Sequence, residues 1–127
     1  MKKKGILTEA DRKLEDEIQA EILLGIGKDF SDSIRAWRNN TGSLKIDNRF
    51  VRFGLKGQAD ISGIMEGGRR LEIEVKTSKG VQSQAQKDYD QMITKFGGIY
   101  LLARDYETVK RYLKYALSLS RGDIEEL

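Results

Sequence analysis

Two carboxylates and one ammonium group are the side chains of this sequence best suited to chemistry. Glu74 and Lys76 flank Val75 in a Glu-x-Lys triplet, and Asp60 precedes Glu74 by fourteen residues. Two carboxylates can hold Mg²⁺, and the cation lowers the pKa of a bound water and neutralises charge on a phosphate. An ammonium group can orient that water or stabilise the transition state. These residues suit phosphodiester hydrolysis, although a lone Glu-x-Lys triplet more often marks the solvated face of a strand.

The composition narrows the chemistry further, because the 127 residues include no His, no Cys and no Pro. These absences exclude a Ser-His-Asp triad, a thiol nucleophile and the usual zinc ligands. An enzyme built from the remaining residue types would most naturally use carboxylates, lysine and a hard cation such as Mg²⁺. The length suits a single domain.

The turn between two strand-like segments decides whether Asp60 can meet the Glu-x-Lys triplet. A two-residue turn at Gly67-Gly68 would place Asp60 opposite Val75, on the wrong face of the hairpin. A three-residue loop at Glu66-Gly67-Gly68 would place Asp60 opposite Glu74, on the same face. The sequence therefore allows the two carboxylates to converge but does not force them to.

The remaining pattern predicts an α/β fold. Apolar residues at helical spacing from Ala10 to Ile22, after a Thr8 N-cap, predict a first helix that ends near Gly25. Strands are expected at 33–39, 60–65, 71–77 and 99–103, a further β-rich segment at 49–53, a turn at 39–42, and helices at 83–97 and 107–120. The helix before the 99–103 strand predicts a parallel neighbour for that strand. The expected order is α-β-β-β-α-β-α, with a central mixed β-sheet flanked by helices.

Positive charge is concentrated in one segment. The whole chain has 23 basic and 20 acidic side chains, a formal net charge of +3. Residues 35–56 hold six basic side chains against Asp47 alone, a net charge of +5. Such a segment just before Asp60 is typical of a surface that binds a polyanion such as nucleic acid, although a solvated basic strand has the same composition. Three interleaved aromatic residues are expected in the core more often than stacked on bases: Trp37, Phe50 and Phe53.

An ordered set of short motifs resembles a nuclease family. Gly57-Gln58-Ala59-Asp60 followed by Glu74-Val75-Lys76 is similar to the PD-(D/E)xK motif, with Ala59 in place of the proline. Over residues 8–103 the chain resembles a stand-alone VRR-NUC domain. The further matching positions are Glu15 with Gln19, Arg38-Asn39 with Gly42, and Ser83 with Gln86. The resemblance implies one VRR-NUC-like nuclease domain over residues 1–127, with a restriction-endonuclease-like core.

The resemblance also implies roles for individual positions. Asp60, Glu74 and the backbone carbonyl of Val75 would bind Mg²⁺ or Mn²⁺. Lys76 would be the catalytic lysine, and Gln86 would support the catalytic site or the substrate phosphate. The implied reaction is the hydrolysis of a phosphodiester bond by an activated water.

A carboxylate from the first helix would complete the metal site, directly or through water. On a helical wheel, Glu15 and Glu17 flank the apolar stripe on opposite sides, and Glu21 lies nearer its middle. Periodicity does not choose among the three. Glu15 stands four residues before Gln19, as in the family's helix, so we expect Glu15 and keep Glu17 and Glu21 as alternatives.

Basic and polar residues around the motif would contact the DNA backbone. They lie in the basic segment, in the loop after the Glu-x-Lys triplet and at the start of the second helix. The expected contacts are Arg38, Asn39, Arg49, Arg52, Lys56, Lys79 and Ser83. Ser83 and Gln86 also form a capping-box pattern, which explains both residues without catalysis.

The expected function is a metal-dependent DNA endonuclease that selects branched DNA such as Holliday junctions by structure. The alternatives are a flap or restriction-type nuclease, and a non-catalytic nucleic-acid-binding module of the same fold. Symmetric cleavage of a junction would need a homodimer, for which the last helix offers Tyr106, Tyr112 and Tyr115. No apolar run approaches the roughly 20 residues of a membrane span, and no signal peptide is recognisable. We expect no membrane partner and the cytoplasm of a bacterial or phage-infected cell.

Overall fold

The computed structural model describes residues 8–40, 42–78 and 80–120, which form a mixed α/β structure. Its strands belong to a four-stranded and a two-stranded sheet. Among the helices described, none has the length and apolar character needed to cross a membrane. In chain order the elements are α1 (Glu9–Asp29), β1 (Ile34–Arg38), β2 (Gly42–Ile46), β3 (Arg49–Phe53), β4 (Ile61–Met65), β5 (Arg70–Val75), α2 (Gln84–Lys95), β6 (Ile99–Ala103) and α3 (Tyr106–Ser120).

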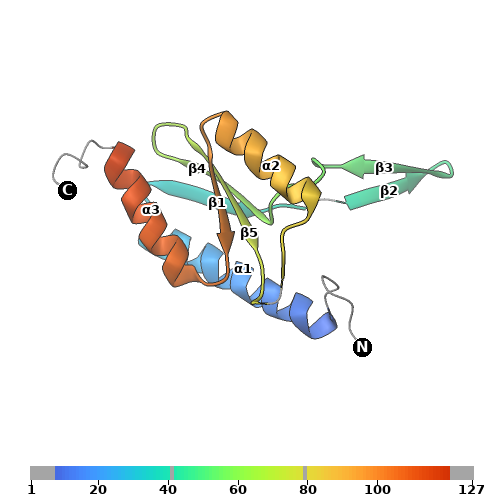
Figure 1. Cartoon of the computed structure of the whole chain (residues 1–127), viewed down its shortest axis with the longest axis horizontal. Coiled ribbons are helices and arrows are strands. Elements are labelled where there is room, and N and C mark those ends of the chain that lie inside the picture. The colour runs from blue at the N-terminus through green and yellow to red at the C-terminus, as the bar shows by residue number, and fades with distance from the viewer. Residues whose placement is uncertain (1–7, 41, 79, 121–127) are drawn as a thin grey trace.

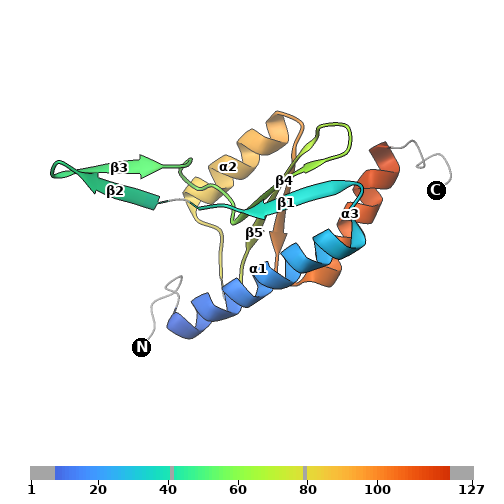
Figure 2. The same cartoon turned by 180° about the vertical axis from the view of Figure 1, so that it is seen from behind.

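The four-stranded sheet has the strand order β1-β4-β5-β6. Neighbours among β1, β4 and β5 are antiparallel, whereas β5 and β6 run parallel, with α2 as the crossover between them. Helices α1 and α3 cover one face of this sheet and α2 covers the other (Figures 1 and 2). The structure therefore confirms the expected mixed central sheet flanked by helices, and the parallel partner of residues 99–103.

The main hydrophobic core lies between the sheet and the helices α1 and α3. Leu71, Ile73 and Val75 are fully buried on this face of β5 and pack with residues of both helices, such as Ile22 and Leu113. Burying one such side chain stabilises the fold by about 1.5–3 kcal/mol relative to leaving it exposed. The alternation of apolar and charged residues predicted this face correctly. The opposite face of β5 is buried as well, because α2 covers it.

Helix α1 continues four residues beyond Gly25, where the sequence pattern places its end. Its first residue follows Thr8, which forms the expected N-cap in a capping box with Asp11. Gly25 stays inside the helix because the ring of Tyr106 lies against it. A Cβ added at Gly25 would come within 2.3 Å of that ring. Gly25 is therefore a packing position between α1 and α3 rather than a helix stop.

Strands β2 and β3 form a separate hairpin that extends away from the rest of the molecule (Figures 1 and 2). The sequence pattern identified β3 but placed Gly42 in a turn and missed β2. Asp47 and Asn48 form the turn with positive φ angles of 48° and 64°, which is the signature of a tight hairpin connection. The expected order α-β-β-β-α-β-α thus describes the elements around the four-stranded sheet and omits this insertion.

The three aromatic residues of the basic segment are exposed, so their expected core position is wrong. The exposed fractions are 41% for Trp37, 75% for Phe50 and 37% for Phe53. Phe50 and Phe53 lie on the hairpin, which packs as a two-stranded sheet of its own. Trp37 lies on the edge strand β1, and the guanidinium of Arg70 lies 5.7 Å from its ring centre.

Candidate active site

The loop between β4 and β5 settles whether the two carboxylates share a face. The Met65 N–H donates to the Arg69 carbonyl at 2.9 Å, next to the pair Ile64 and Arg70, so the loop has three residues, Glu66 to Gly68, and both of its glycines have a φ of 87°. With this loop, Ser62 pairs with Glu72. Continuing the same register by two residues brings Asp60 opposite Glu74, on one face of the sheet. The three-residue alternative is therefore the one that the chain adopts.

Hydrogen bonds from two strands hold Asp60 in place. The N–H of Val75 donates to Oδ2 of Asp60 at 2.8 Å, and the N–H of Asn39 donates to the Asp60 carbonyl at 2.8 Å. The side-chain amide of Asn39 donates to the Ala59 carbonyl at 2.8 Å and to the Ser62 hydroxyl at 2.6 Å. Asn39 therefore anchors the segment that carries Asp60. Its amide nitrogen is engaged within the protein, and the DNA contact that we expect for Asn39 stays a prediction.

The glycine of the Gly-x-x-Asp motif brings the loop before Asp60 against α2. Gly57 has a φ of 78°, and a Cβ added there would lie 2.2 Å from the carbonyl oxygen of Ala85 in the first turn of α2. Only glycine allows both the positive φ and this close approach. The N–H of Leu55 donates to Oε1 of Gln58 at 3.1 Å and closes the same loop. The start of α2 thus helps to position Asp60.

Buried oxygen atoms without hydrogen-bond partners mark the site. Glu74 is only 3% exposed, and its Oε2 has no partner among the described residues. The same holds for Oε1 of Glu15 and for Oγ1 of Thr77. A buried polar atom left unsatisfied typically costs about 1–3 kcal/mol, and more when it is charged. Such atoms in a native fold call for an explanation such as an ion or a water.

Electrostatic interactions connect these carboxylates with Lys76. Burial, and then the nearby charge of Asp60, raises the pKa of Glu74 from 4.5 to about 9, and Lys76 opposes this rise. Burial also raises the pKa of Glu15, where Lys76 opposes and Asp60 reinforces the effect. These mutual influences place Glu15, which comes from α1, within electrostatic range of the carboxylates from β4 and β5.

Among the three candidates on α1, Glu15 is the one that the structure brings to the site. Its side chain is half-buried and interacts with the groups just described. Glu17 and Glu21 are exposed. The buried face of α1 runs through Gln19 and Ile22, and Glu15 lies one turn before Gln19 on that face. The spacing that the family resemblance supplied thus points to the residue that geometry also favours.

Lys76 follows β5, and its stem packs against the loop that comes next. A Cβ added at Gly80 would lie 3.1 Å from Cδ of Lys76. Arg104 holds this loop by donating hydrogen bonds to the carbonyls of Thr77 and Gly80. The sequence analysis did not single out Arg104, because a lone arginine after a strand carries no pattern that would reveal such a role.

Ser83 and Gln86 form the expected capping box at the start of α2. The N–H of Gln86 donates to the Ser83 hydroxyl at 3.2 Å, and the N–H of Ser83 donates to Oε1 of Gln86 at 2.9 Å. These contacts satisfy two N–H groups at the helix start. The catalytic role of Gln86 and the DNA contact of Ser83 stay predictions.

The expected DNA-contacting cations lie at exposed positions where the structure describes them. Arg49 lies on the hairpin, and Lys56 lies in the loop that follows it. Arg38 is exposed at the end of β1, and its guanidinium donates to the Asp16 carbonyl at 3.5 Å. Lys79 and the side chain of Arg52 fall outside the described residues.

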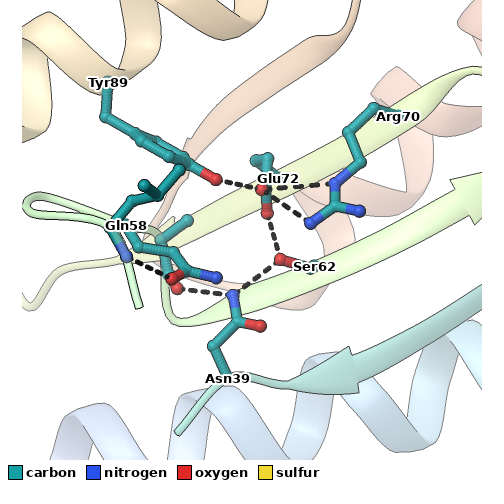
Figure 3. A network of polar contacts seen from close by, with 8 residues as sticks. Asn39, Gln58, Ser62, Arg70, Glu72 and Tyr89 are labelled. Atoms are coloured by element: carbon teal, nitrogen blue, oxygen red, sulfur yellow. Dashed lines mark hydrogen bonds and ion pairs between the residues drawn. The ribbon is translucent and has the colours of Figure 1, made fainter. Parts of the chain in front are cut away.

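A second buried carboxylate, Glu72, lies two residues before Glu74 on the same face of β5. Glu72 is fully buried and accepts hydrogen bonds from Ser62, Tyr89 and Arg70 (Figure 3). Burial and then the bond to Glu72 raise the pKa of Tyr89. The sequence pattern had indicated a solvated face here. It missed this network, because the cover that α2 provides is a tertiary contact.

The carboxylates do not form a ready-made cage for a cation. In residues 8–40, 42–78 and 80–120, no group of three or more Asp, Glu, His or Cys side chains is close enough to hold a metal ion. Asp60 and Glu74 influence each other electrostatically, and Glu15 interacts with both. Comparison of the chain with protein-family models, with curated proteins and with solved structures found no match. Function must therefore be inferred from the geometry.

Proposed function

We propose that this chain is a Mg²⁺- or Mn²⁺-dependent DNA endonuclease with a restriction-endonuclease-like fold of the VRR-NUC type. The observation that carries the proposal is the β4–β5 register, which ends at Ile61 and Ile73 and, continued by one residue, brings Asp60 opposite Glu74, where a buried Glu74 oxygen has no partner among the described residues. Lys76 is two residues away and acts electrostatically on Glu74. Two carboxylates and a lysine around one point are what metal-assisted phosphodiester hydrolysis requires.

The donor set fits a hard cation. Asp60, Glu74 and the Val75 carbonyl are oxygen ligands of the kind that Mg²⁺ and Mn²⁺ prefer. The unpartnered oxygens of Glu74 and Glu15 would gain the interaction that the protein does not supply. Glu15 would complete the metal site, directly or through water. When bound, the cation would lower the pKa of a water and neutralise charge on the scissile phosphate.

The protein's own groups would orient the reacting parts. The hydrogen bond from the Val75 N–H holds the Asp60 carboxylate toward β5. The Lys76 ammonium would stabilise negative charge that develops on the phosphate, or position the attacking water. Its stem is restrained by the loop at Gly80, so the group would need little reorganisation during the reaction. Gln86 would contact the substrate phosphate from the start of α2.

DNA is the proposed polyanion because the basic segment leads directly into Asp60. Its net charge of +5 over residues 35–56 would neutralise phosphates. The residues that the structure describes form one small α/β unit with little surface for reading base sequence, which favours selection of DNA by shape. We therefore propose branched DNA such as a Holliday junction as the substrate. A homodimer would place two such sites on one junction.

The proposed dimer surface needs a correction at one residue. Tyr106 is buried in the main core, and its hydroxyl donates to Asp29 at 2.7 Å. It is therefore not part of the tyrosine-rich surface of α3. Tyr112 and Tyr115 are exposed, by 44% and 50%, and stay as candidates for contact with a second copy.

A cleavage assay with three DNA shapes tests the proposal. A four-way junction, a flap and a linear duplex are incubated with the protein, with and without Mg²⁺ or Mn²⁺. We expect metal-dependent cleavage, fastest on the junction, that Asp60→Ala and Glu74→Ala reduce to background. We expect Lys76→Ala to lose about 10²–10³-fold in rate, as for removal of one transition-state donor.

The exposed glutamate on α1 provides the matched control for this assay. Glu17→Ala should cleave like the wild type, whereas Glu15→Ala should be slower. The catalytic proposal fails if the wild type cuts none of the substrates, or if Asp60→Ala and Glu74→Ala cut as fast as the wild type. Binding of the junction without cleavage by any form would favour the non-catalytic binding module instead.

A further inference from the structure

The β2–β3 hairpin begins and ends beside the candidate active site. Its first strand follows Asn39, whose N–H donates to the Asp60 carbonyl at 2.8 Å, and its second strand leads through the Gly57 loop back to Asp60. From there the hairpin extends clear of the central sheet and its helices (Figures 1 and 2). An isolated two-stranded hairpin is marginally stable at best in water. Binding to a ligand near the reacting phosphate would therefore stabilise this hairpin.

Large apolar side chains are exposed on both faces of the hairpin. The register pairs Leu44 with Val51 and Lys45 with Phe50, so these two pairs lie on opposite faces. Leu44 is 59% exposed, Val51 47% and Phe50 75%. Ile46 and Phe53 extend the first face, exposed by 49% and 37%. An element that packed on one protein surface would need only one apolar face.

The positive charge of the hairpin, together with its exposed apolar side chains, indicates that the ligand is a polyanion with apolar parts. The hairpin and its flanks belong to the segment of net charge +5, and Lys45 and Arg49 are exposed on its two faces. An intact duplex offers phosphates to such an element but keeps its base faces stacked. A strand with unstacked bases offers both phosphates and base faces, because every base has a flat apolar face that stacks on aromatic side chains. Apolar wedges that enter between bases are a known way to hold distorted DNA.

We propose that the β2–β3 hairpin is a wedge that enters the branch point of a DNA junction and takes unstacked bases against both of its faces. The inference rests on the proposed nuclease function and names the feature of the substrate that the protein selects. The five residues of each strand span roughly 16 Å at about 3.3 Å per residue. This length is enough for each face of the hairpin to contact several nucleotides.

Junction binding in a background that cannot cleave gives the first test. In Glu74→Ala, we compare Phe50→Ala with Phe96→Ala, which removes another phenylalanine that is 75% exposed but ends α2. Affinity for a four-way junction and for a linear duplex is measured in the absence of divalent metal. We expect Phe50→Ala to weaken junction binding by about 5- to 150-fold, the range for loss of one base stack. Duplex binding should weaken far less, and Phe96→Ala should change neither.

A fluorescent base reports the contact without relying on cleavage. The fluorescence of 2-aminopurine at the branch point should change when the protein at saturating concentration takes that base out of its stack, and Phe50→Ala should reduce this change. Leu44→Ser tests the opposite face and should also lower junction preference. The side chains of both positions are exposed, and circular dichroism checks that the variants fold like the wild type.

The outcomes separate this inference from the proposed function. If the hairpin variants keep the wild-type ratio of junction to duplex affinity while Glu74→Ala still abolishes cleavage, the wedge is wrong and the nuclease stands. If the variants instead convert a dimer to a monomer in sedimentation velocity and keep that ratio, the hairpin contacts a second copy and the wedge is wrong. Absence of any DNA binding by the wild type would overturn both.

Discussion

Glu72 and Glu74 lie on the same face of β5 and both are buried, but they differ in their hydrogen bonds. Glu72 receives hydrogen bonds from three side chains, whereas Oε2 of Glu74 has no partner among the described residues. Burying a carboxylate without compensation is costly. Satisfied burial is what a structural role requires, and unsatisfied burial is typical of a group that binds a ligand. The contrast within one strand supports a functional role for Glu74.

The raised pKa of Glu74 predicts how the metal-free protein responds to pH. Its folded pKa of about 9 lies above the ordinary 4.5, so between these values the folded state binds more protons than the unfolded state. The contribution of Glu74 to stability is then fully present below about pH 4.5 and is lost as pH rises toward 9. Urea denaturation in EDTA at pH 5, 7 and 9 should show this decline, and Glu74→Gln should reduce it.

Glu17→Gln is the control for that measurement, because Glu17 is exposed on α1. The stability of the Glu17→Gln variant should decline with rising pH as steeply as that of the wild type. Saturating Mg²⁺ should flatten the wild-type curve, since a cation would compensate the charge of Glu74. An equal decline in Glu74→Gln and in the wild type would show that the buried carboxylate is not the cause.

At the residue scale, the sequence predicted which residues lie near one another better than it predicted what surrounds them. The types and spacing of Asp60, Glu74 and Lys76 indicated one site, and the structure brings them into electrostatic contact. The satisfied burial of Glu72 and the anchoring role of Asn39 could not be predicted. Both depend on contacts with elements that are distant in the sequence, and the alternation of residues within one strand does not report such contacts.

At the scale of elements, the close contact between the Gly57 loop and α2 predicts a sharp difference between two glycines. Gly57 and Gly67 both have positive φ, but only a Cβ at Gly57 would meet the backbone of α2. Gly67→Ala should cost about 1 kcal/mol of unfolding free energy from backbone strain alone. Gly57→Ala should cost more and should also slow cleavage, because it displaces the segment that carries Asp60.

Denaturant unfolding and the cleavage assay, measured on the same two variants, check that prediction. If Gly57→Ala is no less stable than Gly67→Ala and cleaves equally fast, the loop does not position the site.

The packing of α1 on α3 makes a second prediction from a pair of glycines. A Cβ at Gly25 would collide with the Tyr106 ring, whereas a Cβ at Gly27 would meet nothing within 4 Å. Gly25→Ala should destabilise the protein by about 1–3 kcal/mol through overpacking. Gly27→Ala should stabilise it by up to about 1 kcal/mol through helix propensity. Thermal unfolding of both variants measures the difference, and a shift of the same sign in the two would refute the packing role of Gly25.

Sequence patterns predicted long elements well and connections poorly. The helices, and the strands of the central sheet, have periodicities that survive in the structure. The predicted end of α1 was wrong because Gly25 lies inside the helix, where it makes a tertiary contact with α3. Strand β2 was missed because its turn uses Asp47 and Asn48 in place of glycine. The length of the Glu66–Gly68 loop, which decides the face of Asp60, could not be chosen from the sequence.

For the molecule as a whole, a bound cation should be visible in its stability. A ligand at 100 times its Kd stabilises the folded state by about 2.7 kcal/mol, which for a chain of this length raises Tm by roughly 10 °C. Differential scanning calorimetry with Mn²⁺ should show this rise for the wild type and for Glu17→Gln. Asp60→Asn and Glu74→Gln should abolish it. A rise that survives in both variants would place the ion elsewhere.

The hairpin of β2 and β3 is a sheet of its own, outside the core cluster that the helices share with the central sheet. Its sequence is therefore free of the packing constraints that bind the rest of the chain. Such an insertion can lengthen, shorten or change composition without disturbing the packing that positions Asp60 and Glu74. In the laboratory, a different hairpin could therefore be grafted between residues 40 and 54, to change the surface that this element presents while the central sheet and its helices stay as they are.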